Sequence, residues 1–387
     1  MSMPVIEILE AGLLTTVQDK GRYGYQRFGM PVAGAMDVFA LRVGDALVGN
    51  DDGAAGLEIT VLGPKLRFLA DTWIAVTGAN LGATLNGEPM AAWQSVEVSK
   101  GSDLGFKGLE NGMRAYLAIA GGIDVPVVMG SRSTYLKAAI GGLEGRGLRP
   151  GDFLDVLDRS GKNTTFVSRT APDIMTQEYG SEHEVRVVFG PQDSRFTEAG
   201  ISTFLGSKYT VAIQSDRMGY RLEGPVIERV DGSDVISDGT SFGAVQVPGD
   251  GQPIVLLADR GTTGGYTKIA TVISSDLHKF AQAMPGQTMS FKSVSIEEAH
   301  EIYRIRESLL DEIRAYPASD SAIESENQTV RLEISVGGRT IEIIDEGDDD
   351  ILIPSWAQNA GVDGQFKGSA SIKGETFEFD VTIQETD

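Results

Sequence analysis

The sequence predicts a mainly β protein with a few helices (an α+β fold), and three observations lead to this prediction. Glycine accounts for 48 of the 387 residues, about twice the usual share, which is typical of a chain with many tight turns. Most apolar runs are short and stand between Gly, Pro, Asn and Asp residues, as in 73–90, 184–193 and 252–261. Only three segments show a helical arrangement of apolar residues.

The N-terminal part of the chain contains one predicted helix and a clear hairpin signal. Apolar residues form a rough helical stripe over 34–50. The segment 85–89 has Asn-Gly between two short runs, which predicts a tight hairpin turn. The polar, turn-rich stretch 158–184 is typical of a link between two β domains. We therefore expect an N-terminal domain over 1–180 and a second domain over 181–316.

Two further helices belong to the second domain. One is predicted around 194–206, and the clearest one covers 296–315, where apolar residues recur at helical spacing. Ser295 and Glu298 form a capping-box pattern that marks the start of this last helix.

The end of the chain is a separate acidic segment. Residues 317–328 have the composition of a linker, and 329–387 is predicted to be a strand-rich appendage with clean alternation over 330–345 and 374–384. Residues 317–387 hold 16 acidic and 4 basic residues, a net charge of -12. The other 316 residues therefore carry -22 - (-12) = -10. The sequence gives no role for this appendage beyond solubility or contact with a partner.

Composition excludes several functional classes. A net charge of -22 argues against nucleic acid as a partner. The chain has no cysteine, and none of its three histidines has a partner at metal-ligand spacing, so no metal site is predicted. The N-terminus does not resemble a signal peptide, and no apolar run reaches the ~18 residues of a membrane span. We expect a cytoplasmic protein that does not contact a membrane.

A pattern of acid, base, Gly, Tyr and base recurs in three loops. It appears in 18–29, in 215–224 and in 256–272. Such loops are either ordinary turns with solvated ion pairs or walls of a binding site, and the residues alone leave both interpretations open. Under the second interpretation, Asp216 and Asp259 suit acid-base chemistry, because a carboxylate beside a cation stays ionised and can accept a proton.

The neighbouring side chains suit a small polar substrate. Arg217 and Arg260 offer planar forks for a carboxylate or phosphate. Gln246 and Gln252 flank a turn and suit a lactam or ureido group, although both also fit the solvent-facing ends of a hairpin. No phosphate-binding loop, dinucleotide fingerprint or nucleophile elbow occurs in the sequence.

Four stretches resemble a known family. The segments 12–37, 115–135, 214–224 and 243–273 are similar to the signature motifs of the KipA family, also called the allophanate hydrolase subunit 2 or biotin-dependent carboxyltransferase family. The resemblance extends in order over about residues 4–295. It implies tandem cyclophilin-like β-barrel domains and a KipI-like partner protein.

The resemblance also implies a function, with alternatives. We expect a subunit of the ATP-dependent 5-oxoprolinase that opens 5-oxo-L-proline to L-glutamate, together with a KipI-like and a LamB/YcsF-like subunit. The ATP site could lie on a partner subunit. One alternative is the carboxyltransferase subunit of a biotin-dependent, urea-type carboxylase or an allophanate pathway enzyme. Another is a non-catalytic regulator that binds a KipI-like kinase inhibitor. No Met-Lys-Met biotinylation motif is present, which favours 5-oxoprolinase.

The family motifs supply the list of candidate site residues. We predict catalytic or orienting roles for Asp216 and Asp259, with both facing one cleft of the second barrel and Arg260 exposed on a loop surface. The predicted substrate-binding residues are Gln18, Asp19, Arg22, Gln26, Ser131, Arg132, Tyr135, Arg217, Gln246, Gln252, Arg260, Thr263, Tyr266 and Lys268.

Overall fold

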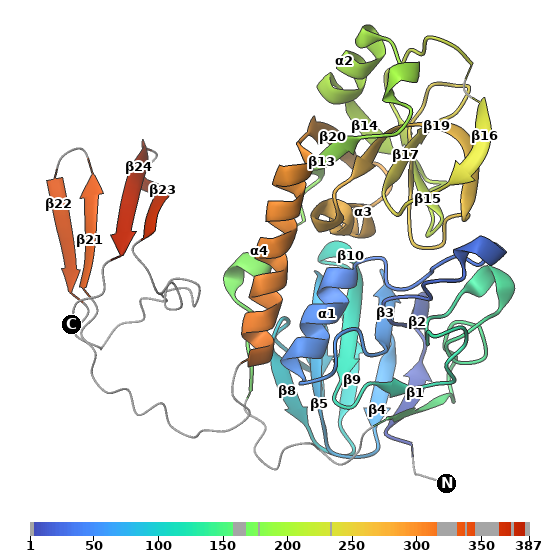
Figure 1. Cartoon of the computed structure of the whole chain (residues 1–387). Coiled ribbons are helices and arrows are strands. Elements are labelled where there is room, and N and C mark those ends of the chain that lie inside the picture. The colour runs from blue at the N-terminus through green and yellow to red at the C-terminus, as the bar shows by residue number, and fades with distance from the viewer. Residues whose placement is uncertain are drawn as a thin grey trace. The chain divides into compact units, whose positions relative to one another are not determined.

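The computed structural model describes residues 4–157, 168–176, 179–232 and 234–315, and the backbone of four strands within 331–383. The chain divides into two compact units, Met1–Ala318 and Ser319–Asp387. The prediction of a mainly β protein with few helices is confirmed (Figure 1). Much of the predicted link over 158–184 falls outside the described residues, and the domain limits of 180 and 181 stay a prediction.

The first half of the large unit consists of two sheets around one core. The first sheet has the strand order β11-β12-β1-β4-β9-β6-β7 and the second has β2-β3-β10-β5-β8. Buried aliphatic and aromatic side chains from both sheets, such as Ile8, Phe68 and Leu117, form a single hydrophobic cluster. The strands are β1 (Ile6–Glu10), β2 (Leu14–Gln18), β3 (Gly56–Thr60), β4 (Lys65–Phe68), β5 (Thr72–Asn80), β6 (Ala83–Leu85), β7 (Glu88–Pro89), β8 (Ser95–Val98), β9 (Asp103–Phe106), β10 (Asn111–Ile119), β11 (Ile123–Asp124) and β12 (Phe153–Val156).

Local sequence signals account for two features of this half. Helix α1 (Val38–Leu47) starts where it does because the Asp37 side chain accepts a hydrogen bond from the Ala40 N–H. It packs on β5 and β10. The predicted hairpin is also confirmed, since Asn86 and Gly87 both adopt positive φ angles, 54° and 87°, between β6 and β7.

The second half of the large unit is a closed barrel. Seven strands form a ring in the order β13-β20-β14-β15-β18-β17-β19, which the pairing of β19 with β13 closes, while β16 lies outside the ring and pairs only with β19. Stacked rings of Phe204 and Phe291, with centroids 4.4 Å apart, fill part of its core. The strands are β13 (Glu182–Phe189), β14 (Lys208–Val211), β15 (Gly219–Glu223), β16 (Asp234–Gly239), β17 (Ala244–Val247), β18 (Ile254–Leu256), β19 (Thr263–Val272) and β20 (Thr288–Ser293), and the barrel also carries α2 (Glu198–Gly206) and α3 (Leu277–Gln282).

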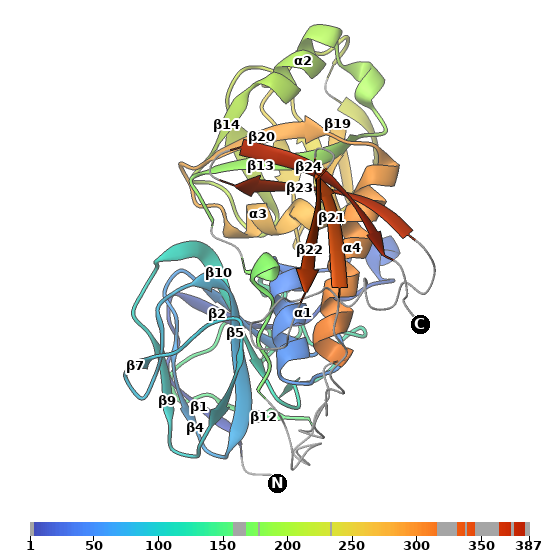
Figure 2. The ribbon, with the colours of Figure 1, turned by 90° about the vertical axis from the view of Figure 1, so that its left-hand side faces the viewer.

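Helix α4 (Ile296–Ala315) follows the barrel and lies beside α1 of the first half, as Figures 1 and 2 both show. Its start agrees with the prediction, because the Ser295 hydroxyl accepts the Glu298 N–H at 3.0 Å. Leu310 and Ile313 are buried in the same cluster as α1. The remaining short helices of the described chain are η1 (Gln26–Phe28), η2 (Leu136–Ala138), η3 (Asp173–Met175), η4 (Asp193–Arg195) and η5 (Ser274–Asp276).

The small unit contains a four-stranded antiparallel sheet with the order β22-β21-β24-β23. Its strands are β21 (Arg331–Val336), β22 (Arg339–Ile344), β23 (Gly364–Ile372) and β24 (Glu375–Ile383). Three of the four fall in the alternating segments predicted to be strands. None of the described helices in either unit combines the length and the apolar character needed to cross a membrane.

Candidate functional site

Three loops from the two halves of the large unit interlock through backbone hydrogen bonds. The Arg22 N–H bonds to the Val32 carbonyl at 2.8 Å, and the Ala33 N–H bonds to the Ala258 carbonyl of the barrel at 3.1 Å. The Asp259 N–H in turn bonds to the Arg217 carbonyl at 2.8 Å. We call this region, built from 19–22, 32–36, 131–135, 216–218 and 258–260, the junction. All three recurring acid-base-Gly-Tyr loops contribute to it.

A buried guanidinium joins the two halves at the junction. Both nitrogens on one edge of Arg217, Nε and Nη2, donate to the two Asp259 carboxylate oxygens at 3.0 Å each. Its Nη1 donates to Glu58 Oε1 of β3 at 2.5 Å, and Nη2 also reaches the Gly34 carbonyl at 2.6 Å. Each nitrogen of Arg217 therefore has a protein partner, and both oxygens of Asp259 are occupied. This arrangement holds the halves together and engages both oxygens of Asp259 in a bidentate salt bridge.

Glu58 is a buried neighbour of Arg217 that sequence reasoning missed. It is fully buried and also accepts the Tyr116 hydroxyl and the Met36 N–H, both at 2.8 Å. Burial alone would raise the pKa of its carboxyl, but Arg217 and Arg114 hold that pKa below its ordinary value. The sequence feature that could have identified it is a charged residue between two apolar neighbours, Leu57 and Ile59. All five residues of this strand, β3, are buried, so the carboxylate has to be paired inside the protein.

Asp19 ties the first motif loop to the second. Its Oδ1 accepts the Gly21 N–H at 2.7 Å and the hydroxyls of Ser131 and Ser133 at 2.7 and 2.5 Å, and its Oδ2 accepts the Arg132 N–H at 2.6 Å. Gln18 donates to the Thr134 carbonyl at 3.1 Å. The predicted residues Gln18, Asp19, Ser131 and Arg132 are thus brought together, and their contacts shape the loops.

Arg22 is buried in the same loop with few partners. None of its surface is exposed, and its Nη2 donates to the Ser133 carbonyl. Its Nε and Nη1 are buried without a hydrogen-bond partner. Burial lowers the pKa of this guanidinium although Asp19 and Asp259 act in the opposite direction. Burial also raises the pKa of Tyr135, another predicted residue of the junction, and Asp259 adds to the effect.

A second group of polar side chains lies beneath β16 of the barrel. Lys268 of β19 is only 3% exposed and forms an ion pair with Asp238 of β16. The Asp238 carboxylate also accepts the Gln192 amide at 3.1 Å. Gln246 is the cross-strand partner of Lys268, and its buried Nε2 has no hydrogen-bond partner.

Arg260 contradicts the expectation of an exposed loop residue, because it is only 8% exposed. Its Nε and Nη1 donate to the carbonyls of Thr240 and Leu257 at 3.3 Å, and its guanidinium lies over the Phe242 ring. The loop folds back onto the barrel, and this packing covers the side chain. Thr240 also lies close to Gln246, so Arg260 adjoins the group beneath β16.

The expected cleft shared by the two aspartates is not formed. The side chain of Asp216 is 56% exposed, accepts the Met218 N–H of its own turn and lies 3.9 Å from Lys137, whereas Asp259 is buried against Arg217. Four more predicted residues lie in exposed or partly exposed places. Gln252 locks a hairpin by bonding to both the N–H and the carbonyl of Gly224, Gln26 caps its own loop, and Thr263 and Tyr266 lie on the exposed end of β19.

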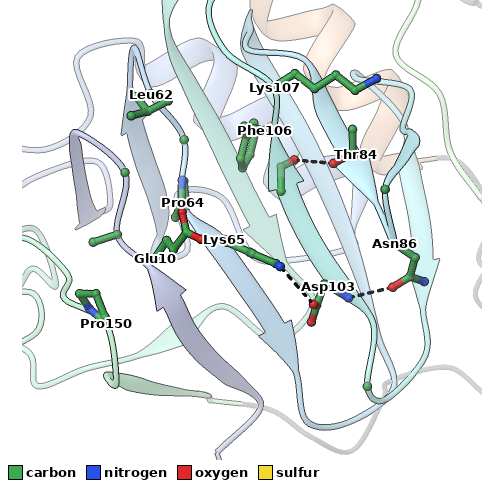
Figure 3. Close-up of a pocket in the computed structure, with 16 residues that line it drawn as sticks. Glu10, Leu62, Pro64, Lys65, Thr84, Asn86, Asp103, Phe106, Lys107 and Pro150 are labelled. Atoms are coloured by element: carbon green, nitrogen blue, oxygen red, sulfur yellow. Dashed lines mark hydrogen bonds and ion pairs between the residues drawn. The ribbon is translucent and has the colours of Figure 1, made fainter.

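One hollow of the described surface is lined by residues outside the junction. It has a volume of about 1030 Å³, and Lys65 of β4 with Asp103 and Phe106 of β9 are among the residues that line it (Figure 3). None of the predicted site residues lines it. Within the described residues, no group of three His, Asp or Glu side chains could hold a metal ion.

Comparison with known proteins identifies relatives over most of the chain. The family model for the carboxyltransferase domain, subdomain A and B, matches residues 28–293. The C subunit of 5-oxoprolinase from Escherichia coli (strain K12) is 43% identical over 295 residues, covering 76% of this chain and 93% of that protein. Urea amidolyase of Saccharomyces cerevisiae is 35% identical over 312 residues, 77% of this chain but only 17% of the yeast protein.

Solved structures agree with these relatives. TTHA0988 superposes with a TM-score of 0.68 and 34% identity, over 76% of this chain and 56% of that one, so the chain spans little more than half of that protein. The Kluyveromyces lactis urea amidolyase gives a TM-score of 0.76 and 27% identity, over 98% of this chain and 26% of that one. The resemblance found in the motifs is therefore confirmed, and the chain belongs to the family of carboxyltransferase domains built from subdomains A and B.

Proposed function

We propose that the chain is the C subunit of a cytoplasmic, ATP-dependent 5-oxoprolinase that opens 5-oxo-L-proline to L-glutamate. The observation that carries this proposal is the 43% identity to the C subunit of the E. coli enzyme over 93% of that subunit's length. The urea amidolyases are less similar, and this chain spans only a small fraction of their length. The other members of the complex are a KipI-like and a LamB/YcsF-like subunit, and the ATP site belongs to the complex as a whole.

The chemistry of the junction and of the group beneath β16 suits this substrate. Opening the lactam breaks its C–N bond, adds the oxygen of water to the carbonyl carbon and places a proton on nitrogen. The substrate presents a carboxylate and a lactam oxygen, which both accept hydrogen bonds. Arg22, Arg260, Gln246 and Lys268 supply buried N–H donors, and two of these side chains have donors without a protein partner. Their role is to bind and orient the substrate.

Asp259 has a positioning role in this proposal. Both of its oxygens accept N–H groups of Arg217, so we assign Asp259 no proton-transfer step. Four of the five N–H groups of Arg217 are likewise engaged by Asp259, Glu58 and the Gly34 carbonyl. The two residues fix the junction, and the residues around them contact the substrate.

Reconstitution tests the proposal. This chain is combined with its KipI-like and LamB/YcsF-like partners, and ATP-dependent release of glutamate from 5-oxoproline is measured. The rate should fall to background when this chain is omitted. Lys268→Met should reduce the rate by roughly 100-fold, because in this proposal the buried Lys268 ammonium binds the substrate. Lys208→Met, which removes a lysine on the exposed surface of the same barrel, should not. An unchanged rate without this chain would refute the proposal.

The second candidate is the carboxyltransferase part of a urea-type carboxylase. The TM-score of 0.76 to the K. lactis urea amidolyase favours it. In that case the chain should bind biotin or a biotinylated carrier protein, which calorimetry measures directly. The 5-oxoprolinase proposal predicts no such binding.

A further inference from the structure

The carboxylate of Asp238 on β16 is bound by two donors of the barrel wall. The Lys268 ammonium forms an ion pair with its Oδ1, and the Gln192 side-chain amide donates to its Oδ2 at 3.1 Å. One carboxylate thus receives a cation on one oxygen and an amide N–H on the other, an arrangement that suits any free carboxylate. We call Lys268 and Gln192 the donor pair.

The donor pair is held in place by bonds that do not involve Asp238. Lys268 is only 3% exposed, and its backbone N–H donates to Gln192 Oε1 at 3.1 Å. This bond uses the oxygen of the Gln192 amide, so its Nε2 is directed to the carboxylate. The Gln192 N–H also bonds to the Lys268 carbonyl at 3.4 Å. Both donors therefore keep their positions when Asp238 leaves.

Asp238, in contrast, lies on a strand with little support. Among the described strands β16 pairs with β19 alone, and Figure 1 shows it on the outer side of the barrel. Five of its six residues are exposed, and Ile236 is 95% exposed. Its register with β19 is broken between Asp234 and Asp238. A strand with few buried contacts opens at low cost, so β16 is the side of the ion pair that can move.

A third donor lies beside the donor pair. Gln246 is the cross-strand partner of Lys268 and is 6% exposed, and its buried Nε2 has no hydrogen-bond partner. A buried N–H without a partner lowers the stability of the fold, and a ligand acceptor at this place would remove that cost. A small molecule with a carboxylate and a second hydrogen-bond acceptor therefore matches the three donors.

We propose that Lys268 and Gln192 form a carboxylate-binding subsite, that Asp238 fills this subsite in the ligand-free chain, and that the ligand's carboxylate displaces it. Strand β16 is then a strap over the subsite, which ligand binding lifts. The inference rests on the proposed function only for the identity of the carboxylate, 5-oxo-L-proline, whose lactam oxygen is the second acceptor.

Competition between Asp238 and the ligand gives the first test. Calorimetric titration of the full chain with 5-oxo-L-proline, and separately with acetate, measures the dissociation constants. Asp238→Asn should bind 5-oxo-L-proline roughly tenfold more tightly than the native chain, because the internal competitor has lost its charge. Lys268→Met and Gln192→Met should lose the binding. The matched control is Glu182→Gln, which removes one negative charge from an exposed ion pair of the same barrel and should leave the dissociation constant unchanged.

The outcomes of this titration separate the subsite from the proposed function. If acetate binds more tightly to Asp238→Asn than to the native chain while 5-oxo-L-proline binds to neither, the subsite stands and the proposed substrate is wrong. If Asp238→Asn weakens carboxylate binding or leaves it unchanged, Asp238 is not a competitor and the proposal is refuted. An equal gain in Glu182→Gln, or no carboxylate binding to either the native chain or Asp238→Asn, would also refute it.

A disulfide between β16 and β19 gives the second test. A Cβ added at Gly265 of β19 would lie 3.5 Å from Ser237 Oγ, so cysteines at these two positions can be joined, and the chain has no other cysteine. In the oxidised double variant Ser237→Cys/Gly265→Cys, the strap cannot lift. Its affinity for the carboxylate that binds in the first test should fall by at least about tenfold, and reduction with dithiothreitol should restore it. Equal affinity in the oxidised and reduced forms would show that β16 stays in place during binding and would overturn the displacement.

Discussion

Arg217 and Arg22 both lie in motif loops with little exposure, yet their hydrogen bonding differs. Arg217 connects Glu58 of the first half to Asp259 of the barrel and has a partner for each nitrogen. Arg22 donates to one protein group, the Ser133 carbonyl, and its Nε and Nη1 have no partner. Both residues are arginines in family motif loops, so the sequence does not distinguish them. Only their contacts separate an arginine whose nitrogens are all engaged by the protein from one with unpartnered nitrogens.

Glu58 stabilises the contact between the two halves through Arg217, and substitution of Glu58 should therefore lower the stability of the chain. Glu58→Gln keeps the shape of the side chain but removes the charge that faces Arg217 and Arg114. The free energy of unfolding at pH 7 should fall by about 3–5 kcal/mol, because breaking a buried ion pair leaves its partners uncompensated. Urea denaturation measures this change. Asp103→Asn, which breaks an exposed pair with Arg67, should cost less than ~1 kcal/mol. Equal losses in the two variants would contradict a special role for Glu58.

The same carboxylate predicts how stability depends on pH. The pKa of Glu58 in the folded chain lies below its ordinary value of 4.5, chiefly because Arg217 and Arg114 outweigh the effect of burial. A carboxylate whose pKa is lower in the folded chain than in the unfolded chain stabilises the fold at any pH above the unfolded-state pKa. This stabilisation is lost as the pH falls through the folded-state pKa. The free energy of unfolding should therefore drop more steeply below about pH 4.5 in the native chain than in Glu58→Gln. If the free energy of unfolding falls equally steeply with decreasing pH in both proteins, the pKa of Glu58 is not lowered in the folded chain.

At the scale of elements, β16 and β19 position the polar side chains beneath β16, among them Lys268 and Gln246. A Cβ at Gly264 of β19 would lie 2.4 Å from Gln246 Nε2, and the backbone there is not left-handed. Gly264→Ala should therefore displace a flexible amide and change the free energy of unfolding by less than about 1 kcal/mol. Activity in the reconstituted complex should fall roughly tenfold, because the amide no longer faces the substrate. Gly239→Ala on β16, where the added methyl meets no atom within 4 Å, is the control. Equal activity of the two variants would exclude Gln246 from the site.

Helix α4 should contribute to the stability of both halves of the large unit. Leu310 is fully buried in the cluster that it shares with α1, whereas Ile305 on the same helix is 52% exposed. Leu310→Ala should reduce the free energy of unfolding by about 2–5 kcal/mol and Ile305→Ala by far less. Denaturation followed by tryptophan fluorescence checks both. A Leu310→Ala loss as small as that of Ile305→Ala would mean that α4 is not part of the core.

At the scale of the whole molecule, local signals were predictable from the sequence and long-range pairing was not. The Asn86-Gly87 turn and the Ser295 cap depend on neighbouring residues only, so their patterns identify them. The Glu58–Arg217 pair joins residues 159 positions apart, which no spacing rule reaches. Burial of Arg260 likewise depends on how its loop packs, and β23 was not predicted because its sequence has little alternation of apolar and polar residues. The family motifs marked loops that meet at the junction, but they did not separate residues whose polar groups are engaged, such as Arg217, from residues with unpartnered nitrogens, such as Arg22.

Removal of the small unit should leave the large unit folded. The two units are separate compact bodies, and the clusters of buried apolar residues lie within residues 5–313. A chain ending at Ala318 loses a net charge of -12 and keeps -22 - (-12) = -10, so it should elute earlier from an anion exchanger. Its main thermal transition should stay within about 2 °C of that of the full chain, because no core contact of the large unit is lost. A larger drop in melting temperature would mean that the acidic unit stabilises the large unit, and addition of the separately produced 319–387 segment should then restore the transition. If the transition is unchanged and glutamate release in the reconstituted complex falls, the acidic unit acts on a partner protein or on the reaction, since the fold is already complete without it.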